Sequence, residues 1–107
     1  MKRLPVRWTT PAYADLFEIL EFVASDRPDA ARRLGRELLK QSKTLGGSAL
    51  RGRIVPELLQ QGITVYREIL VSRYRLIYHL HPEAVQVAAV MDASRDVGEV
   101  LLRRLLR

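Results

Sequence analysis

The sequence predicts a single α+β domain made of an N-terminal strand, a helical hairpin, a mostly antiparallel sheet and a short C-terminal helix. The chain has 107 residues, a length at which proteins form one domain. Its apolar residues recur every three or four positions up to residue 46 and mostly every second position afterwards. Hydrophobic residues make up 48% of the chain and charged residues 28%, which is enough apolar surface for a folded core. We therefore expect residues 1–107 to be one domain, with helices packed on one face of a sheet.

The first strand is predicted at residues 4–8, where apolar and charged side chains alternate after an early proline. A helix should begin at Thr9-Thr10-Pro11, because this segment offers an N-cap hydroxyl followed by a proline suited to the first turn. Apolar residues then recur at helical spacing, and we expect them to form one buried stripe: Tyr13, Leu16, Phe17, Leu20 and Val23.

The second helix is predicted from Asp29 to Gly46, after a break and a new cap at residues 25–28. Ala31, Leu34, Leu38 and Leu45 keep the helical period, and the short connection makes the two helices a hairpin. Five cations lie mostly away from that apolar stripe, and we expect a solvated face rather than a binding surface from them: Arg32, Arg33, Arg36, Lys40 and Lys43.

The second half of the chain predicts a sheet followed by a final helix. Strands are expected at residues 53–56, 64–71, 74–80 and 85–91, and short turns make the last three an antiparallel meander. The final helix is expected at residues 97–107, where cations in the last turns suit the helix dipole.

Composition limits the chemistry that the chain can carry. Cysteine is absent, which excludes disulfides, zinc–thiolate sites, iron–sulfur clusters and thiol nucleophiles. The net charge of +6 and the pI near 10.3 favour a polyanion or an acidic protein as partner, although GC-rich genomes also favour the arginine codons that supply 15 of the 18 cations. No apolar run approaches the roughly 20 residues that cross a bilayer, and no signal-peptide core follows Met1. We therefore expect a cytoplasmic protein with no membrane contact.

An arginine-lined surface is predicted on one side of the sheet. Alternation in the strand 74–80 places Arg75 and His79 on the face opposite Tyr74, Leu76 and Tyr78. If the aromatic face packs on the helices, Arg75 projects from the other side. Further arginines lie on the neighbouring strand or at strand ends and turns, and together they predict a concave surface that grips phosphates or an acidic segment: Arg51, Arg53, Arg67, Arg73 and Arg95.

Several alternatives remain open for these charged residues. Arg67 and Arg75 are cross-strand neighbours only if the register allows it, and they can instead form surface ion pairs with Glu57 and Glu68. His79 is the candidate general base, because imidazole titrates near neutral pH, but no partner is placed beside it.

Motifs for metals and nucleotides are missing from the sequence. Asp92 and Asp96 flank a turn after the last strand, and we expect turn formation and helix capping from them, with no metal and no cofactor. The chain has no glycine-rich phosphate loop, no HExxH and no GxSxG, so an enzyme of a motif-bearing class is not expected.

Five short motifs together resemble a known toxin superfamily. They are Val6-Arg7-Trp8-Thr9-x-x-Ala12-x-x-Asp15-Leu16, Gly52-Arg53-Ile54-Val55-Pro56-Glu57, Tyr66-Arg67-Glu68, Tyr74-Arg75-Leu76-Ile77-Tyr78 and Ser94-Arg95-Asp96. Their order and spacing resemble the RelE/ParE toxins of bacterial type II toxin–antitoxin modules over nearly the whole chain. The resemblance implies a small sheet with a helical hairpin after its first strand. It also implies growth inhibition or plasmid stabilization by one of two routes: RelE-like members cleave mRNA on the ribosome without a metal, and ParE-like members inhibit DNA gyrase.

The resemblance favours the ParE-like branch, because the nuclease set is only partly present. Arg75 matches the catalytic arginine, Arg95 the basic position after the last strand, and Arg67 a catalytic lysine. Ile69 stands at the second lysine position and Leu101 at the tyrosine position, where leucine can neither transfer a proton nor stack through a π-face. If the chain is a nuclease, its set is Arg67, Arg75, Arg95 and His79.

The resemblance also implies partners. The leading expectation is a gyrase-binding toxin neutralised by an antitoxin with an acidic, partly disordered segment. The alternatives are a ribosome-dependent mRNA interferase and an inactive member kept for antitoxin binding. The stripe Leu101, Leu102, Leu105 and Leu106 is either part of the antitoxin interface or docked on the domain's own core. The expected binding residues for target or antitoxin are Arg51, Arg53, Arg67, Arg73, Arg75, Arg95, Leu101 and Leu105.

Overall fold

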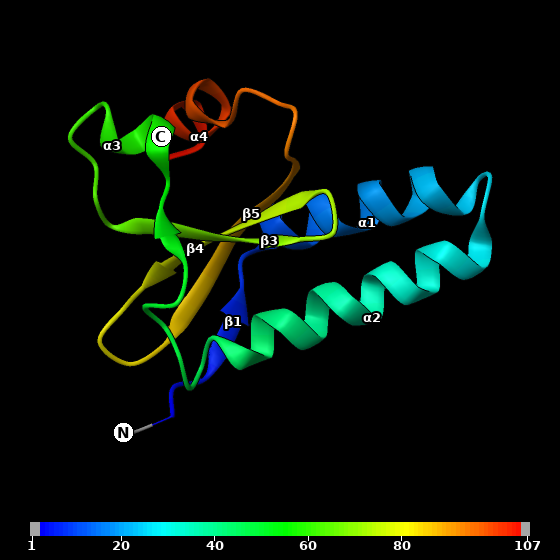
Figure 1. The fold of residues 1–107 in the computed structure, drawn as a ribbon, viewed down its shortest axis with the longest axis horizontal. Coiled ribbons are helices and arrows are strands. Elements are labelled where there is room, and N and C mark those ends of the chain that lie inside the picture. The colour runs from blue at the N-terminus through cyan, green and yellow to red at the C-terminus, as the bar shows by residue number, and fades with distance from the viewer. Residues whose placement is uncertain (1–2, 106–107) are drawn as a thin grey trace.

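The computed structural model describes residues 3–105, and its elements follow the predicted order with one short helix added (Figure 1). The α+β class with a hairpin after the first strand is confirmed. The elements are β1 (Val6–Trp8), α1 (Thr10–Ala24), α2 (Pro28–Thr44), β2 (Arg53–Ile54), α3 (Pro56–Leu59), β3 (Tyr66–Val71), β4 (Tyr74–Leu80), β5 (Val85–Asp92) and α4 (Val97–Leu105).

The five strands form one sheet in the order β1-β5-β4-β3-β2. The pairs from β2 to β5 are antiparallel, which confirms the predicted meander of β3, β4 and β5. β1 instead pairs in parallel with β5, with Val6 opposite Val85 and Trp8 opposite Val87. A parallel pair needs a long crossover, and here the intervening chain, which includes the α1–α2 hairpin, connects the two strands.

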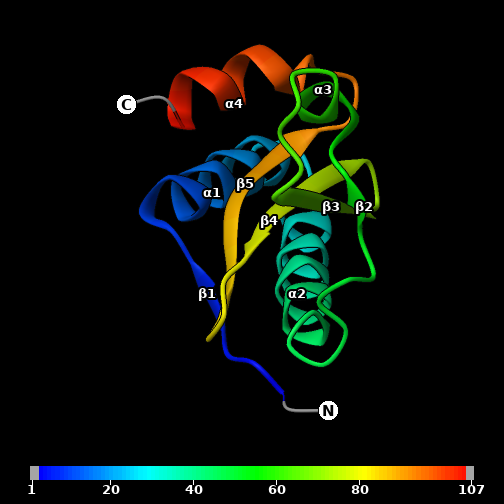
Figure 2. The ribbon, with the colours of Figure 1, turned by 90° about the vertical axis from the view of Figure 1, so that its left-hand side faces the viewer.

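The sheet is covered on both faces rather than on one, which corrects the expected two-layer arrangement. α1 and α2 cover one face over a core that includes Leu16, Leu38 and Tyr78. α3 and α4 cover part of the other face over a second core that includes Ile77 and Leu101. Figure 2 shows α3 and α4 together at one side of the sheet and α2 at the other. Because the side chains of β4 alternate, this strand supplies both cores, and its first five residues are all buried.

The buried stripe of α1 differs from the predicted one. Thr9 caps the helix, its hydroxyl accepting a hydrogen bond from the backbone N–H of Ala12, and Ala12 and Leu16 face the core. Tyr13 and Phe17 are exposed instead of buried, and they form a stacked series with Trp8, with ring centroids 5.4 and 6.3 Å apart. They lie one turn apart on the side of α1 that neither the sheet nor α2 covers.

The short helix α3 is absent from the sequence prediction, which continued β2 to residue 56. Pro56 has no N–H to give to a strand partner and suits the first turn of a helix, so the chain turns there. Leu58 is fully buried and fixes α3 against the second core. α2 begins similarly at Pro28, without the side-chain cap that the sequence predicted, because the N-cap position is held by Arg27.

Candidate functional site

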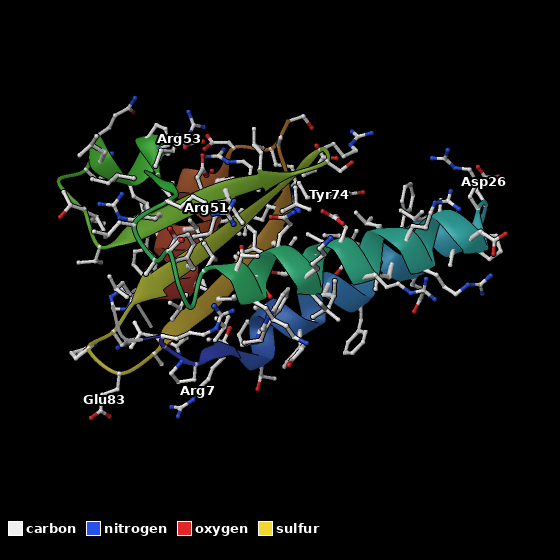
Figure 3. The ribbon with its side chains drawn as sticks, turned by 60° about the horizontal axis from the view of Figure 1, so that its bottom comes forward. Arg7, Asp26, Arg51, Arg53, Tyr74 and Glu83 are labelled. Atoms are coloured by element: carbon white, nitrogen blue, oxygen red, sulfur yellow. The ribbon has the colours of Figure 1, made fainter. Side chains whose placement is uncertain are left out.

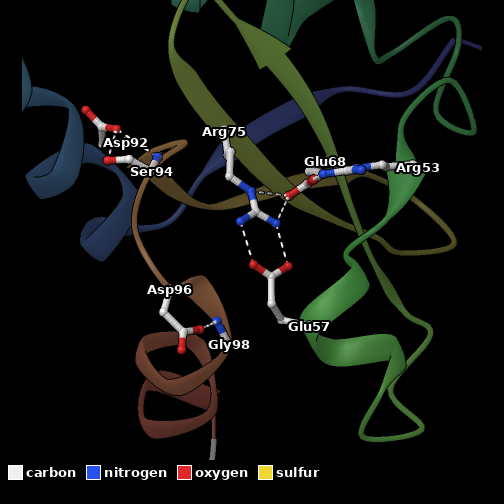
Figure 4. A network of polar contacts seen from close by, with 8 residues as sticks. All are labelled: Arg53, Glu57, Glu68, Arg75, Asp92, Ser94, Asp96 and Gly98. Atoms are coloured by element: carbon white, nitrogen blue, oxygen red, sulfur yellow. Dashed lines mark hydrogen bonds and ion pairs between the residues drawn. The ribbon is translucent and has the colours of Figure 1, made fainter.

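The guanidinium group of Arg75 is enclosed by two carboxylates (Figure 4). Its Nη1 and Nη2 donate to the two oxygens of Glu57 at 2.6 Å each, in bidentate geometry. Its Nε donates to Glu68 at 2.7 Å, and its Nη2 lies at the same distance from Glu68. Only 5% of Arg75 and 2% of Glu68 is exposed. Arg75 does lie on the sheet face opposite α1 and α2, as predicted, but it does not project into a solvent-filled hollow.

The local fold explains why Glu57, Glu68 and Arg75 meet, and it adds Arg53 as a fourth member. Glu68 lies opposite Arg53 in the register of β2 and β3, and Arg53 donates to Glu68 through Nε at 2.7 Å. Arg75 lies one strand further along on the same face, and α3 places Glu57 above it. The network therefore holds two arginines and two glutamates, and its formal charge sums to zero. We name Arg53, Glu57, Glu68 and Arg75 the arginine–glutamate network.

Hydrogen bonds and burial shift the protonation of this network. The hydrogen bonds from Arg75 hold the pKa of Glu57 below its ordinary value, against an opposing effect of burial. The same bonds with Glu57 raise the pKa of Arg75. Both groups are therefore charged at neutral pH. An incoming phosphate must displace a carboxylate from Arg75 before it can bind there, and that exchange costs a buried hydrogen-bonded ion pair.

The remaining predicted arginines do not share one surface with Arg75. Arg67 lies opposite Tyr78 on the other sheet face and donates to the carbonyl of Gly52 at 2.7 Å, so Arg67 and Arg75 are not cross-strand neighbours. Arg51 is exposed, and its Nη2 donates to the hydroxyl of Thr44 at the end of α2 at 2.6 Å. The expected concave arginine surface is therefore divided, because strand alternation and the added helix α3 separate its members.

Arg73 and Arg95 line a different place, a groove of about 930 Å³ between α1, the end of β5 and α4. Arg73 pairs with Asp92 at 2.9 Å. Arg104 pairs with Asp15 at 2.9 Å across one side of this groove, and thereby joins α4 to α1. The apolar part of the lining is supplied by Ile19, Phe22, Tyr74, Val90, Met91 and Val100.

Sequence reasoning missed most of this groove. Asp15 and Arg104 are 89 positions apart, and no local pattern predicts their pairing. The one available signal was Phe22, a large apolar residue outside the predicted stripe of the first helix. It is 80% exposed, the highest fraction among the exposed large apolar residues of the described chain.

The first two leucines of the predicted stripe, Leu101 and Leu102, are docked on their own domain. Leu101 is fully buried in the second core, and Leu102 is partly buried against it. Leu101 is therefore not a free binding residue, which corrects that expectation. The side chain of Leu105 and all of Leu106 lie outside the described part of the structure.

His79 lies apart from Arg75 on the same face of β4. Four residues of strand separate their Cα atoms by about 13 Å, too far for both side chains to act on one scissile phosphate. The ring of His79 contacts those of Tyr66 and His81, with centroids 5.0 and 4.2 Å apart. Its Nδ1 is buried and has no hydrogen-bond partner among residues 3–105. Burial, and then the neighbouring His81, lower the pKa of His79.

The acidic residues at and after the end of β5, Asp92 and Asp96, shape the backbone, as predicted. Asp92 accepts hydrogen bonds from the backbone N–H and the hydroxyl of Ser94, and Asp96 accepts one from the N–H of Gly98 at the start of α4. Within residues 3–105, no three histidine or acidic side chains are grouped closely enough to hold a metal ion. In the same residues, no helix is long and apolar enough to cross a membrane.

Comparisons with known proteins agree with this architecture. A family model described as the ParE toxin of the type II toxin–antitoxin system parDE matches residues 6–97. The fold is similar to a chain of the chromosomal ParDE toxin–antitoxin system from P. aeruginosa, with a TM-score of 0.73 and 16% identity over 86% of this chain and 98% of that one. It is also similar to the YoeB dimer from Staphylococcus aureus, with a TM-score of 0.53 and 20% identity over 83% of this chain and 95% of that one. No curated protein sequence matches the chain.

Proposed function

Because the chain belongs to the ParE toxin family of type II toxin–antitoxin systems, we propose that it stops growth by binding DNA gyrase and not by cutting RNA. The observation that carries the choice is the arginine–glutamate network. The arginine that a RelE-like nuclease needs for its phosphate is already held by Glu57 and Glu68. The position of the nuclease tyrosine is occupied by Leu101, whose side chain is in the core.

Two assays on the same preparation test this proposal. Purified protein added to gyrase and relaxed plasmid is expected to inhibit supercoiling or to trap cleaved DNA. Primer extension on mRNA from cells expressing the protein is expected to show no codon-linked cuts. Clean cuts on translated mRNA together with an unaffected gyrase reaction would contradict the proposal and favour a ribosome-dependent nuclease.

We also propose that a cognate antitoxin masks the toxin by laying an amphipathic segment into the groove between α1, β5 and α4. The groove combines exposed apolar side chains, chiefly Phe22, with Arg95 and Glu18, neither of which has an ion-pair partner in the described chain. A disordered acidic segment that folds there buries apolar surface and pairs its carboxylates with Arg95. Arg73 is proposed to contribute at the rim, where most of its side chain is exposed.

A pair of variants on one helix tests the groove. Phe22→Ala is expected to weaken binding of the antitoxin by at least about tenfold, as for a central aromatic anchor. Phe17→Ala removes a similarly exposed aromatic ring outside the groove and serves as the matched control. Isothermal titration with the antitoxin encoded beside the toxin gene measures both. Equal losses for the two variants would place the antitoxin elsewhere.

A further inference from the structure

The outward face of α2 carries a line of cations that have no acidic partner. Arg33, Arg36, Lys40 and Lys43 are all exposed, and none has a carboxylate oxygen within 4.0 Å among the described residues. At 3.6 residues per turn they lie within about 80° of one another, and the first and last are about 15 Å apart along the axis. Figure 3 shows α2 in front of the sheet with no other element over its outer side.

Two arginines from distant parts of the chain extend this line at the end of α2. Arg51 donates to the hydroxyl of Thr44, and Arg3 donates to the carbonyl of Lys43 at 3.3 Å. We name the six cations Arg3, Arg33, Arg36, Lys40, Lys43 and Arg51 the α2 basic surface. The fold gathers residues from the N-terminal segment, the helix and the loop before β2 onto one side of the molecule.

The α2 basic surface holds a large share of the cations of the chain. The chain has 18 cations and 12 acidic residues. Six of the cations lie on this surface, and the remaining 12 equal the acidic residues in number. Elsewhere in residues 3–105 several arginines are paired, including Arg73, Arg75 and Arg104. The two acidic residues of α2 are engaged by other side chains, Asp29 by Arg32 and Glu37 by Gln41, so neither forms an ion pair with the α2 basic surface.

The chemistry of this surface suits a phosphate backbone better than a folding protein segment. A segment that folds on binding needs apolar surface to bury, and α2 exposes little of it: Ala31 and Leu38 are buried against the rest of the domain, and Leu39 is 38% exposed. A rigid row of cations about 15 Å long meets several phosphates of a duplex, which carries one charge per 1.7 Å of its axis. Arginine adds hydrogen bonds to phosphate oxygens.

We propose that α2 binds the phosphate backbone of duplex DNA through the α2 basic surface, without reading its sequence. The choice of DNA rests on the proposed function, because a toxin bound to gyrase lies beside the DNA that gyrase holds. The contact holds the toxin on the enzyme–DNA complex in addition to its protein contacts.

Binding of the free toxin to DNA tests the proposal without gyrase. Fluorescence anisotropy follows a labelled duplex of about 24 base pairs between about 50 and 200 mM salt. The variant Arg33→Gln/Arg36→Gln/Lys40→Gln is expected to bind at least about tenfold more weakly at about 100 mM salt, with a log–log salt slope lower by about 2 to 3. Glutamine is a good helix former, so α2 should persist, and circular dichroism checks this.

A control variant that loses three charges elsewhere on the protein distinguishes binding at the α2 basic surface from a general effect of the net charge. Arg7→Gln/Arg73→Gln/Arg103→Gln removes three exposed cations from outside α2 and is expected to change the affinity less than about threefold. Equal losses for both triple variants would overturn the proposal, as would tighter binding to single-stranded RNA or to polyglutamate than to the duplex.

The gyrase assay then distinguishes the two proposals. Wild-type protein that binds the duplex through α2 but leaves gyrase active retains this inference and rejects the proposed target. Wild-type protein that inhibits gyrase, with a salt slope unchanged in the α2 variant, rejects this inference and retains the target.

Discussion

At the scale of single residues, Arg75 links two elements of the fold through buried ion pairs. Its three guanidinium nitrogens all contact carboxylate oxygens, and the two glutamates come from different elements, α3 and β3. Because Arg75 is buried and fully paired, we expect it to be a structural residue. Loss of toxicity in a variant of Arg75 is therefore not evidence for a catalytic or binding role.

Arg75→Ala is expected to lower the free energy of unfolding by about 3 kcal/mol, because it leaves Glu68 as a buried charge with only Arg53 beside it. Urea denaturation measures the change. Arg103→Ala is the control, since the one ion pair that Arg103 makes within residues 3–105 is exposed and 3.9 Å long, and the variant should stay within about 0.5 kcal/mol of wild type. The double change Glu68→Leu/Arg75→Met should recover part of the loss. A stable Arg75→Ala protein would contradict the structural role.

His79 is expected to make the protein less stable as the pH falls below about 6.5. Its folded pKa is lowered by burial and by His81, so the unfolded chain binds the proton more readily, and stability rises with pH across the window between the two pKa values. His79→Phe keeps an aromatic ring beside Tyr66 and should flatten this dependence between about pH 7 and 5.5.

The comparison for that experiment is His81→Gln, which keeps the ring of His79 and its burial, the larger cause of the lowered pKa, and removes only the smaller effect of His81. Denaturation midpoints at about pH 7 and 5.5 compare the three proteins. The same slope in wild type and His79→Phe would show that other groups cause the pH dependence.

At the scale of secondary-structure elements, α3 and α4 are packed so closely that each holds the other in place. A Cβ built at Gly98 would lie 2.9 Å from the Cβ of Glu57, so the start of α4 touches α3 where Glu57 holds Arg75. The absence of a side chain at residue 98 thus lets α4 settle over the second core. The helix cap from Asp96 fixes the same turn.

Gly98→Ala is expected to destabilise the protein by about 1 to 3 kcal/mol, although alanine is the better helix former, because the added methyl group forces α4 away from α3. Thermal unfolding measures this. Gly62→Ala is an informative comparison. A Cβ at residue 62 meets nothing within 4 Å, but the backbone φ of +77° strains any side chain. A loss of stability in this variant therefore comes from backbone strain and not from close packing. Chemical shift changes in α3 should appear only for Gly98→Ala.

At the scale of the whole molecule, the two layers on the sheet are held by different means. The α1–α2 layer rests on a large apolar core, whereas α3 and α4 rest on a smaller core and the arginine–glutamate network. Acid should therefore act first on the α3–α4 layer. Its charged contacts are the ones that protonation removes.

Acidification is expected to release α3 and α4 before the rest of the domain unfolds. The folded pKa of Glu57 is lowered by Arg75, so its contribution to stability is complete above the ordinary value of about 4.5 and is lost as the pH falls through the folded pKa. Hydrogen exchange monitored by mass spectrometry should show faster exchange in α3 and α4 at about pH 4 than at about pH 6. Glu57→Gln should remove that difference, and uniform loss of protection across both layers would contradict the expectation.

The sequence alone predicted the hairpin, the meander and the caps of α1 and α4, but neither α3 nor the uncapped start of α2, because periodicity, prolines and turn residues act locally. Thr9 and Asp96, for example, cap the helices that their positions predicted. Motif order likewise led to the correct toxin family. The same local signals placed Arg75 on the right face of its strand.

The contacts of the charged residues depend on how distant parts of the chain come together in space. Whether Arg75 contacts a phosphate or Glu57 depends on α3, a four-residue helix that is too short to be predicted from hydrophobic periodicity. The pair Asp15–Arg104 joins positions near the two ends of the chain. The gathering of Arg3 and Arg51 beside α2 has the same origin. Electrostatic partners are set by distance in space, whereas sequence patterns report neighbours along the chain.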